Sequence, residues 1–333
     1  MRTFFEKRWW KGGDSQSLFA LEPLSVLFGV LIQWRAVFLR AHAEKLPIPV
    51  VVVGNITVGG SGKTPIIMAL SESLKNGIGH LGIISRGYGR KTRGVLEVFG
   101  DSRAESVGDE PLLMKRHLGE IPIFVGEDRV AAAKMLLKKY PNTALILSDD
   151  GLQHYKLSRT FEIAVFDERG IGNGFLLPRG PLREPVSRLT TVDAILLNGS
   201  VQGDFLNAVN VPIFESTSTA GSPYALENPS IQKPLGDFIE IGAVTGIGNS
   251  ERFFNSLKNA GLKLVFQKAF PDHHFFTADD FENTTLPIFI TEKDAVKCRK
   301  LNLKNVWVLP IRAQIQKSLT QMILEKIHGI ARI

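Results

Sequence analysis

The chain contains only one cysteine, Cys298, in 333 residues. A single thiol excludes an internal disulfide framework and a metal site built from several cysteines, and it fits a reducing compartment. Zinc-finger spacing, RNA-binding signatures, basic repeats and low-complexity tracts are also missing, so no motif supports nucleic acid as a partner. We likewise predict no obligate protein partner.

Acidic residues are fewer than basic ones, and the formal net charge is +7 with a pI near 9.4. This balance favours an anionic partner such as a nucleotide or a phospholipid head group. The apolar fraction of 44% and the charged fraction of 22% are typical of a globular protein. The length allows two domains of ordinary size.

Long apolar runs are scarce as well. In the N-terminal region, residues 1–45, the uncharged stretch 23–34 covers 12 residues, whereas a helix that crosses a bilayer needs about 20. No small-residue cleavage site follows it, as one would in a secretory signal. Apolar residues recur at helical spacing, with Arg35 and Arg40 placed to reach a head-group layer. We expect a helix that lies in the membrane interface; a core helix of a soluble protein explains the same residues.

A glycine-rich motif stands between an apolar run at 48–54 and a helix-competent segment at 66–75. Strand, glycine-rich loop, Gly-Lys-Thr and helix are the parts of a loop that holds nucleotide phosphates and Mg²⁺, although its first position is usually glycine. A glycine-rich turn with a chance Gly-Lys-Thr is the alternative. The residues predicted to bind the nucleotide are Thr57, Val58, Gly59, Gly60, Ser61, Gly62, Lys63 and Thr64.

Apolar runs and helical patterns alternate after this motif. The alternation predicts a P-loop NTPase-like, doubly wound, mainly parallel α/β sheet. The elements expected in this first unit are strands at 48–54, 80–85, 121–125, 144–148, 161–166 and 194–197, and helices at 66–75, 111–118 and 127–139.

Residues 216–235 are small, polar and interrupted by proline, which predicts a linker. We therefore expect a nucleotide-binding domain at 46–215 and a smaller α/β domain at 236–333. The elements expected in the smaller domain are strands at 238–244, 264–267 and 287–290, and helices at 251–260, 293–300 and 317–327.

Two adjacent carboxylates, Asp149 and Asp150, follow the strand expected at 144–148. Ligands of nucleotide-binding α/β sheets sit at this edge of the strands, where a carboxylate is the expected second partner of Mg²⁺. An Asp-Asp-Gly turn is the alternative, because both residue types favour turns.

Two further motifs contain candidate proton acceptors. Gly108-Asp-Glu-Pro111 opens a helix, and an N-cap explains Asp109 fully, so the residues alone favour a cap over catalysis. Pro271-Asp-His-His274 places paired histidines in a loop of the second unit, where one can orient a group or relay a proton. A solvated loop histidine is the alternative.

Two loops carry basic residues. Ser85-Arg-Gly-Tyr-Gly-Arg90 suits phosphate or an acidic substrate group. Leu177-Pro-Arg-Gly-Pro-Leu-Arg-Glu-Pro185 is ordered by its prolines, and loops held in this way usually carry function.

Together these motifs resemble the tetraacyldisaccharide 4′-kinases of lipid A synthesis. Eight motifs follow one another in family order from residue 50 to 300, and the set is highly specific. Thr57 is shared with that family's loop, whereas Arg179 stands where a small residue such as alanine is expected. The motifs not yet quoted are Asp149-Asp-Gly-Leu-Gln-His154, Gly172-Asn-Gly174 with Pro181-Leu-Arg-Glu-Pro185, Thr245-Gly-Ile-Gly-Asn249 and Thr291-Glu-Lys-Asp-Ala-Val-Lys297.

The resemblance implies a membrane-associated kinase with two α/β domains and an active site in the cleft between them. ATP would donate its γ-phosphoryl group to the 4′-hydroxyl of a tetraacylated glucosamine disaccharide 1-phosphate. The implied location is the cytoplasmic face of the inner membrane of a Gram-negative bacterium.

The resemblance also implies roles for single residues. Lys63 would hold the phosphates, Asp109 would accept the hydroxyl proton, and His273 would pair with Asp109. The implied Mg²⁺ site consists of Thr64 and Asp149, with Asp150 and Glu110 close by. The implied contacts to the disaccharide and its 1-phosphate are Arg86, Gln153, His154, Arg183 and Glu184.

A protein of another class, a membrane-recruited switch or partitioning ATPase, explains the phosphate loop and the basic N-terminus equally well. The histidine loop of the second domain argues against it, because a switch needs no acceptor-side base. A soluble small-molecule kinase with the N-terminal helix in its core is a third alternative.

Overall fold

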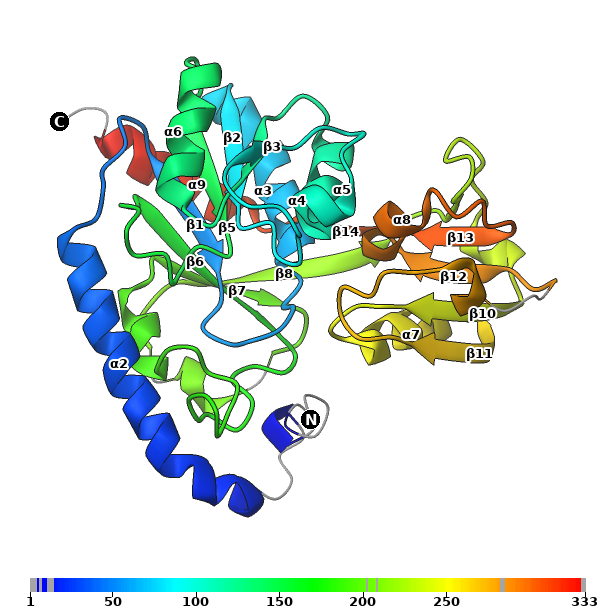
Figure 1. Cartoon of the computed structure of the whole chain (residues 1–333), viewed down its shortest axis with the longest axis horizontal. Coiled ribbons are helices and arrows are strands. Elements are labelled where there is room, and N and C mark those ends of the chain that lie inside the picture. Colours follow the sequence, from blue (N-terminus) through cyan, green and yellow to red (C-terminus); the bar gives the residue numbers. More distant parts are fainter. Residues whose placement is uncertain are drawn as a thin grey trace.

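The computed structural model describes residue 5, residues 8–10 and residues 15–330 except 202, 208 and 282–284. These residues form a nine-stranded sheet and a five-stranded sheet beside it, and one long helix runs along the outside of the larger unit (Figure 1). The expected α/β fold with a second, smaller unit is confirmed.

The larger sheet is parallel except at its two edges, where β3 and β14 run antiparallel to their neighbours. Its central strand β1 is buried along its whole length, as expected for a run of valines covered on both faces. The strands, in sheet order, are β14 (Ile311–Ile315), β8 (Ile213–Ala220), β7 (Ala194–Asn198), β6 (Phe161–Asp167), β1 (Val50–Gly54), β5 (Leu145–Asp149), β2 (Leu81–Ser85), β4 (Ile123–Val125) and β3 (Leu96–Glu97).

Helices cover both faces of this sheet, and each face has its own apolar core. On one face lie α3 (Lys63–Ile78), α4 (Ala104–Val107), α5 (Asp109–Leu118) and α9 (Lys317–Ile330). On the other lie α6 (Arg129–Lys139) and the 3-10 helix η2 (Val186–Thr191).

The smaller sheet is packed between α7 (Ser250–Asn259) and α8 (Glu292–Cys298). Its strands, in sheet order, are β11 (Lys263–Ala269), β10 (Glu240–Thr245), β12 (Ile288–Thr291), β13 (Val306–Leu309) and β9 (Tyr224–Ala225). Short 3-10 helices lie at η3 (Asp204–Leu206), η4 (Leu235–Asp237) and η5 (Ala278–Asp280). Every strand and helix expected from the sequence in the two domains is present, with bounds that agree within about three residues.

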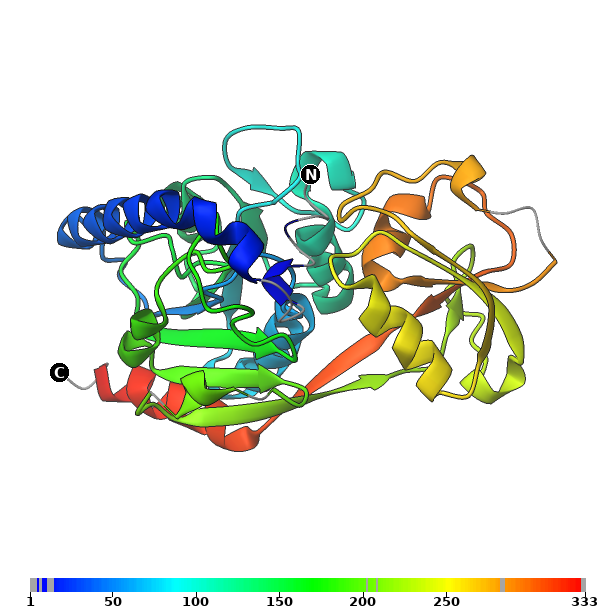
Figure 2. The ribbon, with the colours of Figure 1, turned by 90° about the horizontal axis from the view of Figure 1, so that it is seen from below.

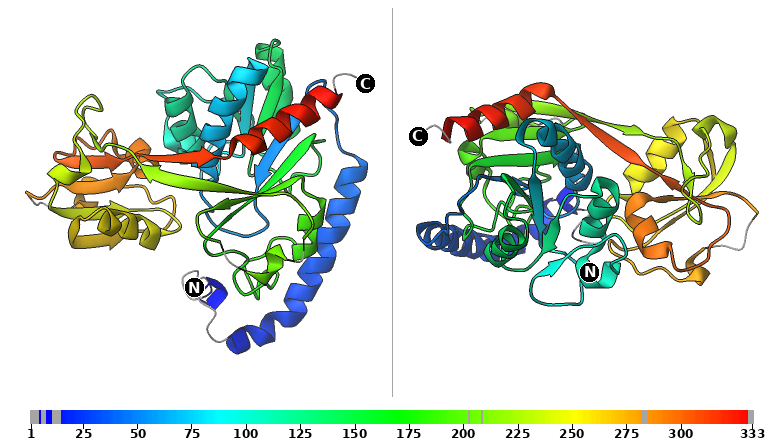
Figure 3. Two further views of the ribbon diagram at one scale, coloured as in Figure 1. Left: turned by 180° about the vertical axis from the view of Figure 1, so that it is seen from behind. Right: turned by 90° about the horizontal axis from the view of Figure 1, so that it is seen from above.

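The structure corrects the domain boundaries. The expected linker 216–235 begins inside β8, which pairs with β7 and β14 of the larger sheet, and it also contains β9. Helix α9, expected in the smaller domain, packs on the core of the larger one beside α3 (Figure 3). The chain therefore passes between the domains along β8 and returns along β14 (Figure 2). Small polar residues suggested a linker, but β14 supplies them with backbone partners.

The N-terminal helix is longer than its uncharged stretch. The 3-10 helix η1 (Ser15–Leu21) leads into α2 (Glu22–Ala41), and the helical segment Leu18–Ala41 has 24 residues and a mean hydropathy of 1.5. It is long and apolar enough, by length and composition, to cross a membrane, so the expectation that this region is too short is wrong. Only 11% of its apolar window is buried, which does not fit a core helix. Part of 1–45 lies outside the described residues.

Candidate active site

The loop between β1 and α3 has the geometry of a phosphate-binding loop. Gly62, just before α3, adopts a left-handed conformation with a φ of 74° and gives the helix no side-chain cap. A side chain there would be strained and would collide with the Asn198 amide. The first-turn N–H groups of α3 are therefore left for an anion.

Thr57, at the position where glycine is usual, is accommodated by a contact with another loop. It forms a backbone bridge with Leu182, and the neighbouring Val58 N–H donates to the Pro181 carbonyl at 2.9 Å. The phosphate loop is thus joined directly to the basic 177–185 loop.

Asp149 ends β5 and is the carboxylate that is best suited to a cation. Its Oδ2 accepts a hydrogen bond from Ser85 Oγ at 2.7 Å, while its buried Oδ1 has no hydrogen-bond partner among the described residues. Burial, and next to it the charges of Glu110 and Asp150, raise the pKa of Asp149 to about 7. An orphaned oxygen on a destabilised carboxylate fits a site for a metal ion.

Two other expected metal ligands are paired with basic side chains. Asp150 accepts from both Arg183 nitrogens at 3.0 and 3.1 Å, and it lies 3.4 Å from Lys63 Nζ. Burial opposes ionisation of Asp150, but Arg183 and Lys63 hold the pKa of that carboxyl below its usual range. Glu110 accepts from Lys293 Nζ at 2.8 Å. Among the described residues, no group of three or more His, Cys, Asp or Glu side chains is placed to hold a metal ion.

Asp109 and His273 come from different domains and lie together. His273 Nδ1 is 3.0 Å from each Asp109 carboxylate oxygen, across 164 positions of sequence. The N-cap of α5 is Gly108, so the cap explanation for Asp109 is wrong. Burial acts to raise the pKa of Asp109. The charge of Lys293, the hydrogen bond from His273 and the charge of Lys297 outweigh it and lower that pKa to about 2.

The smaller domain also approaches the phosphate loop. A Cβ placed on Gly248 would lie 3.7 Å from the Gly60 nitrogen. Arg252 at the start of α7 donates to Asn198 Oδ1 at 3.2 Å, and Asn198 in turn donates to the Ser61 carbonyl. The active-site elements of the two domains therefore meet at the nucleotide loop.

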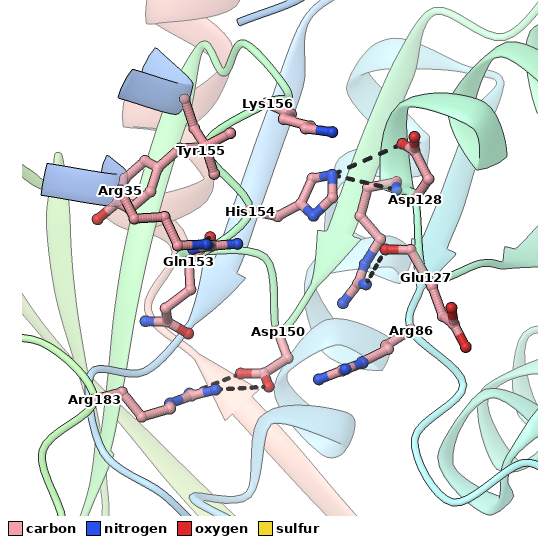
Figure 4. Close-up of a pocket in the computed structure, with 12 residues that line it drawn as sticks. Arg35, Arg86, Glu127, Asp128, Asp150, Gln153, His154, Tyr155, Lys156 and Arg183 are labelled. Carbon is pink, nitrogen blue, oxygen red and sulfur yellow. Dashed lines mark hydrogen bonds and ion pairs between the residues drawn. The ribbon is translucent and has the colours of Figure 1, made fainter. Parts of the chain in front are cut away.

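Four of the five expected substrate contacts line one cavity of about 320 Å³ beside α2: Arg86, Gln153, His154 and Arg183 (Figure 4). The remaining lining is Arg35, Leu39, Glu127, Asp128, Arg129, Asp150, Tyr155 and Lys156. Arg35 reaches the cavity from α2 and donates to the Gln153 carbonyl at 3.3 Å. His154 Nε2 accepts the Arg129 N–H, and burial, then the charge of Arg129, lowers the pKa of His154 to about 4. The cavity is rich in cationic side chains and suits an anionic group.

Glu184 is placed differently from the other expected contacts. It is 3% exposed, and its two oxygens accept from Gln153 Nε2 at 2.7 Å and from the Tyr155 hydroxyl. Its geometry is that of a residue that holds Gln153 rather than one that touches a ligand.

Sequence reasoning assigned no role to Lys293, Lys297 and Arg129. The two lysines stand four apart in the quoted Thr291–Lys297 motif, a spacing that puts both on one helix face and was the available signal. Arg129 begins α6 and is 4% exposed. It is an isolated basic residue outside the quoted motifs, so the sequence did not indicate a role for it.

A phosphate loop at the end of a central parallel strand, strand-end carboxylates and a carboxylate–histidine pair formed between two domains define a P-loop kinase. The sequence profile of the tetraacyldisaccharide-1-P 4′-kinases matches residues 17–328. The chain belongs to this family, and the resemblance inferred from its motifs is confirmed.

Named relatives cover nearly the whole chain. The tetraacyldisaccharide 4′-kinase of Dechloromonas aromatica is 42% identical over 99% of this chain and 98% of its own length, and that of Neisseria gonorrhoeae is 43% identical over 99% and 97%. A crystal structure of LpxK from Aquifex aeolicus in complex with ATP is similar with a TM-score of 0.77 and 29% identity, and covers 93% of this chain and 99% of that one. The chain is therefore a kinase, and the switch ATPase alternative is not supported.

Proposed function

We propose that this protein transfers the γ-phosphoryl group of ATP to the 4′-hydroxyl of tetraacyldisaccharide 1-phosphate and so forms the 1,4′-bisphosphate. The observation that carries the proposal is the pair of buried Asp109 and half-buried His273, contributed by two domains that also meet at the phosphate loop. A switch ATPase has no use for such a pair, whereas a kinase needs a group that receives the acceptor hydroxyl.

On the donor side, the first-turn N–H groups of α3 and the Lys63 ammonium bind the β and γ phosphates. Lys63 is held beside Asp150, so its charge is in place before ATP arrives. Thr64 and the free oxygen of Asp149 would hold Mg²⁺, which needs few protein ligands when it also binds phosphates. When bound, that ion neutralises charge on the transferred group.

On the acceptor side, Asp109 accepts a hydrogen bond from the sugar hydroxyl and takes its proton as the O–P bond forms, and His273 fixes the orientation of the carboxylate. A carboxylate with a pKa of about 2 is a weak base. Phosphoryl transfer has a loose transition state in most analyses and needs little proton removal early on, so orientation of the hydroxyl is the main contribution.

The basic cavity binds the disaccharide and its 1-phosphate through Arg86, Arg183, Gln153 and His154. Neutral His154, with its Nε2 occupied by a donor, offers Nδ1–H to an anion. Glu184 keeps Gln153 in place.

The protein lies on the membrane as a monotopic enzyme, and the proposed location is the cytoplasmic face of the inner membrane. One side of α2 presents exposed leucines, valines, Trp34 and Phe38. Its other side is fastened to the larger domain, where Ser25 Oγ donates to the Leu176 carbonyl at 2.8 Å. A helix docked on one side cannot be surrounded by lipid, so it lies in the interface and keeps the cavity at head-group level.

The test is transfer of label from γ-labelled ATP to tetraacyldisaccharide 1-phosphate in the presence of Mg²⁺. We expect labelled lipid with the wild type and background labelling with Lys63→Ala. ADP release at the same rate with and without the lipid, and no labelled lipid, would instead indicate an ATPase.

A further inference from the structure

The motif Thr291–Lys297 is a quoted segment to which the proposed mechanism gives no task. Thr291 caps α8 by accepting the Asp294 N–H at 3.1 Å. Lys293 and Lys297 follow one helical turn apart, and both side chains point to the boundary with α5 of the larger domain.

Lys293 ties the two domains together. Its Nζ lies 2.8 Å from Glu110 Oε1 on α5 and 3.1 Å from Asp272 Oδ1 next to His273. Both contacts satisfy a charge, so Lys293 is accounted for as an inter-domain ion pair.

Lys297 is different, because its side chain is 3% exposed and its Nζ makes no hydrogen bond of good geometry within the described residues. The ammonium is held 3.0 Å from Asp294 Oδ1 and 5.0 Å from the centre of the Phe276 ring. On its other side it faces Asp109 Oδ2 at 3.9 Å. Burying a cation costs free energy unless the cation is paired with negative charge.

Asp294 is itself rigidly placed. It is fully buried and accepts hydrogen bonds from Thr245 Oγ1 and Thr291 Oγ1, each at 2.7 Å, and from the Gly246 N–H at 3.2 Å. The position of Lys297 is therefore set by the smaller domain, and so is the electric field that it exerts on Asp109.

We propose that Lys297 is a positioning residue for the phosphoryl acceptor, and that its ammonium holds the Asp109 carboxylate in the orientation in which it faces both His273 and the sugar hydroxyl. The proposal rests on the function proposed above. Without this cation, the hydrogen bonds from His273 and from the Glu110 N–H and the more general attraction of Lys293 are left to orient Asp109. Attraction at this distance is strong because neither partner is exposed to water.

The experiment compares Lys297→Met with wild type by label transfer, with the exposed Lys300→Met as a matched control. We expect kcat of Lys297→Met to fall about tenfold or more while KM for ATP changes less than about twofold, and Lys300→Met to match wild type. Should the methionine variant not fold, Lys297→Gln, which can still donate to Asp294, gives the same comparison.

A double-mutant cycle with Asp109→Asn separates positioning from a merely structural effect. If Lys297 acts through Asp109, Lys297→Met costs little further kcat in the Asp109→Asn protein. An equal loss in both backgrounds, or an unchanged kcat in the single variant, overturns the proposal. Failure of the wild type to label the lipid would instead overturn the proposed function itself, and the two results are read separately.

Discussion

Asp149 and Asp150 are neighbours in sequence but have opposite electrostatic surroundings. Asp150 faces Arg183 and Lys63, which keep it ionised, whereas Asp149 is buried with one oxygen free and a pKa raised to about 7. The two carboxylates therefore differ in what they can bind. Asp150 is occupied by the Arg183 and Lys63 side chains, whereas Asp149 has an oxygen that can bind a metal ion.

Lys63→Ala should abolish turnover with the fold intact. The backbone of the loop is set by its glycines, so the melting temperature of the nucleotide-free protein should change little. kcat should fall by about 100-fold or more, because the Lys63 ammonium no longer stabilises the negative charge of the transferred group. ATP should also stabilise the variant less against heat than it stabilises wild type. Near wild-type activity in a folded variant would contradict the loop assignment.

Asp109→Asn should lower kcat by about 10²–10⁴-fold with little change in ATP affinity, since the role proposed for the residue is to accept the proton of the sugar hydroxyl. His273→Ala should have a similar but milder effect. Because the two side chains share hydrogen bonds, the double variant should lose clearly less than the product of the single losses. Fully multiplicative losses would mean that they act separately. Steady-state kinetics for both substrates provide the measurement.

His154 should make the protein less stable in acid. Its pKa is lowered to about 4 from an ordinary value of 6.5. Between these pH values the unfolded chain binds a proton that the native protein does not, so the free energy of unfolding decreases as the pH is lowered. His154→Gln should lose less unfolding free energy than wild type between pH 7 and pH 5 in urea titrations. An identical pH slope in the two proteins would mean that His154 is protonated in the native state.

At the scale of elements, α2 is fastened by a residue that departs from the expected pattern. Arg179 pairs with Glu22 at the start of α2 and stacks on the Phe175 ring, with its guanidinium 3.5 Å from the ring centre. Further along, Arg40 lies over the Tyr155 ring at 4.4 Å. The structure therefore gives Arg179 an anchoring contact to the helix.

Replacing Leu27 and Leu31 by glutamine should weaken membrane attachment. Both are more than half exposed on the free face of α2, and burying each leucine in lipid contributes about 1.5–3 kcal/mol. Flotation with anionic liposomes should drop, and KM for the lipid should rise more than KM for ATP. Ile239→Gln, at the most exposed large apolar residue among those described, is the control and should float like wild type. Equal flotation of all three proteins would contradict the interfacial role.

At the scale of the molecule, the two domains are joined by a two-stranded ribbon rather than by a flexible segment. β8 and β14 pair over five residues, and the chain returns to finish as α9 on the core of the larger domain. Helix α9 thus contributes to the stability of the nucleotide-binding unit, although it is distant in sequence from the rest of that unit.

Leu319→Ala should destabilise the larger domain by about 2–5 kcal/mol, because the side chain is fully buried against α3 and its loss leaves a cavity. The measurement is a urea titration in which unfolding of the larger domain is monitored by the loss of nucleotide binding. Gln321→Ala, exposed on the same helix, should be nearly neutral. A loss confined to the smaller domain would restore the boundary that the sequence suggested.

The sequence by itself determined the local features of this protein. The phosphate loop, the strand-end carboxylates and the alternating strands and helices of both domains follow from glycines at special backbone angles and from apolar runs of fixed period. Each depends on residues close in sequence. The unpredicted elements, α4, β3, β8, β9, β13 and β14, are mostly strands that are short or rich in small polar residues, and their pairing partners decide whether they form.

Only the tertiary structure decided which of these features act together. From the residues alone, Asp109 was a helix cap and His273 a solvated histidine; the packing of two domains makes them a pair. Tertiary packing also pairs Asp150 with Arg183 and Glu110 with Lys293. It makes Glu184 a buried partner of Gln153, and it joins Arg179 to Glu22 of α2. The physical reason is that burial and charge–charge distance set the state of an ionisable group, and both depend on chain segments that no local pattern brings together.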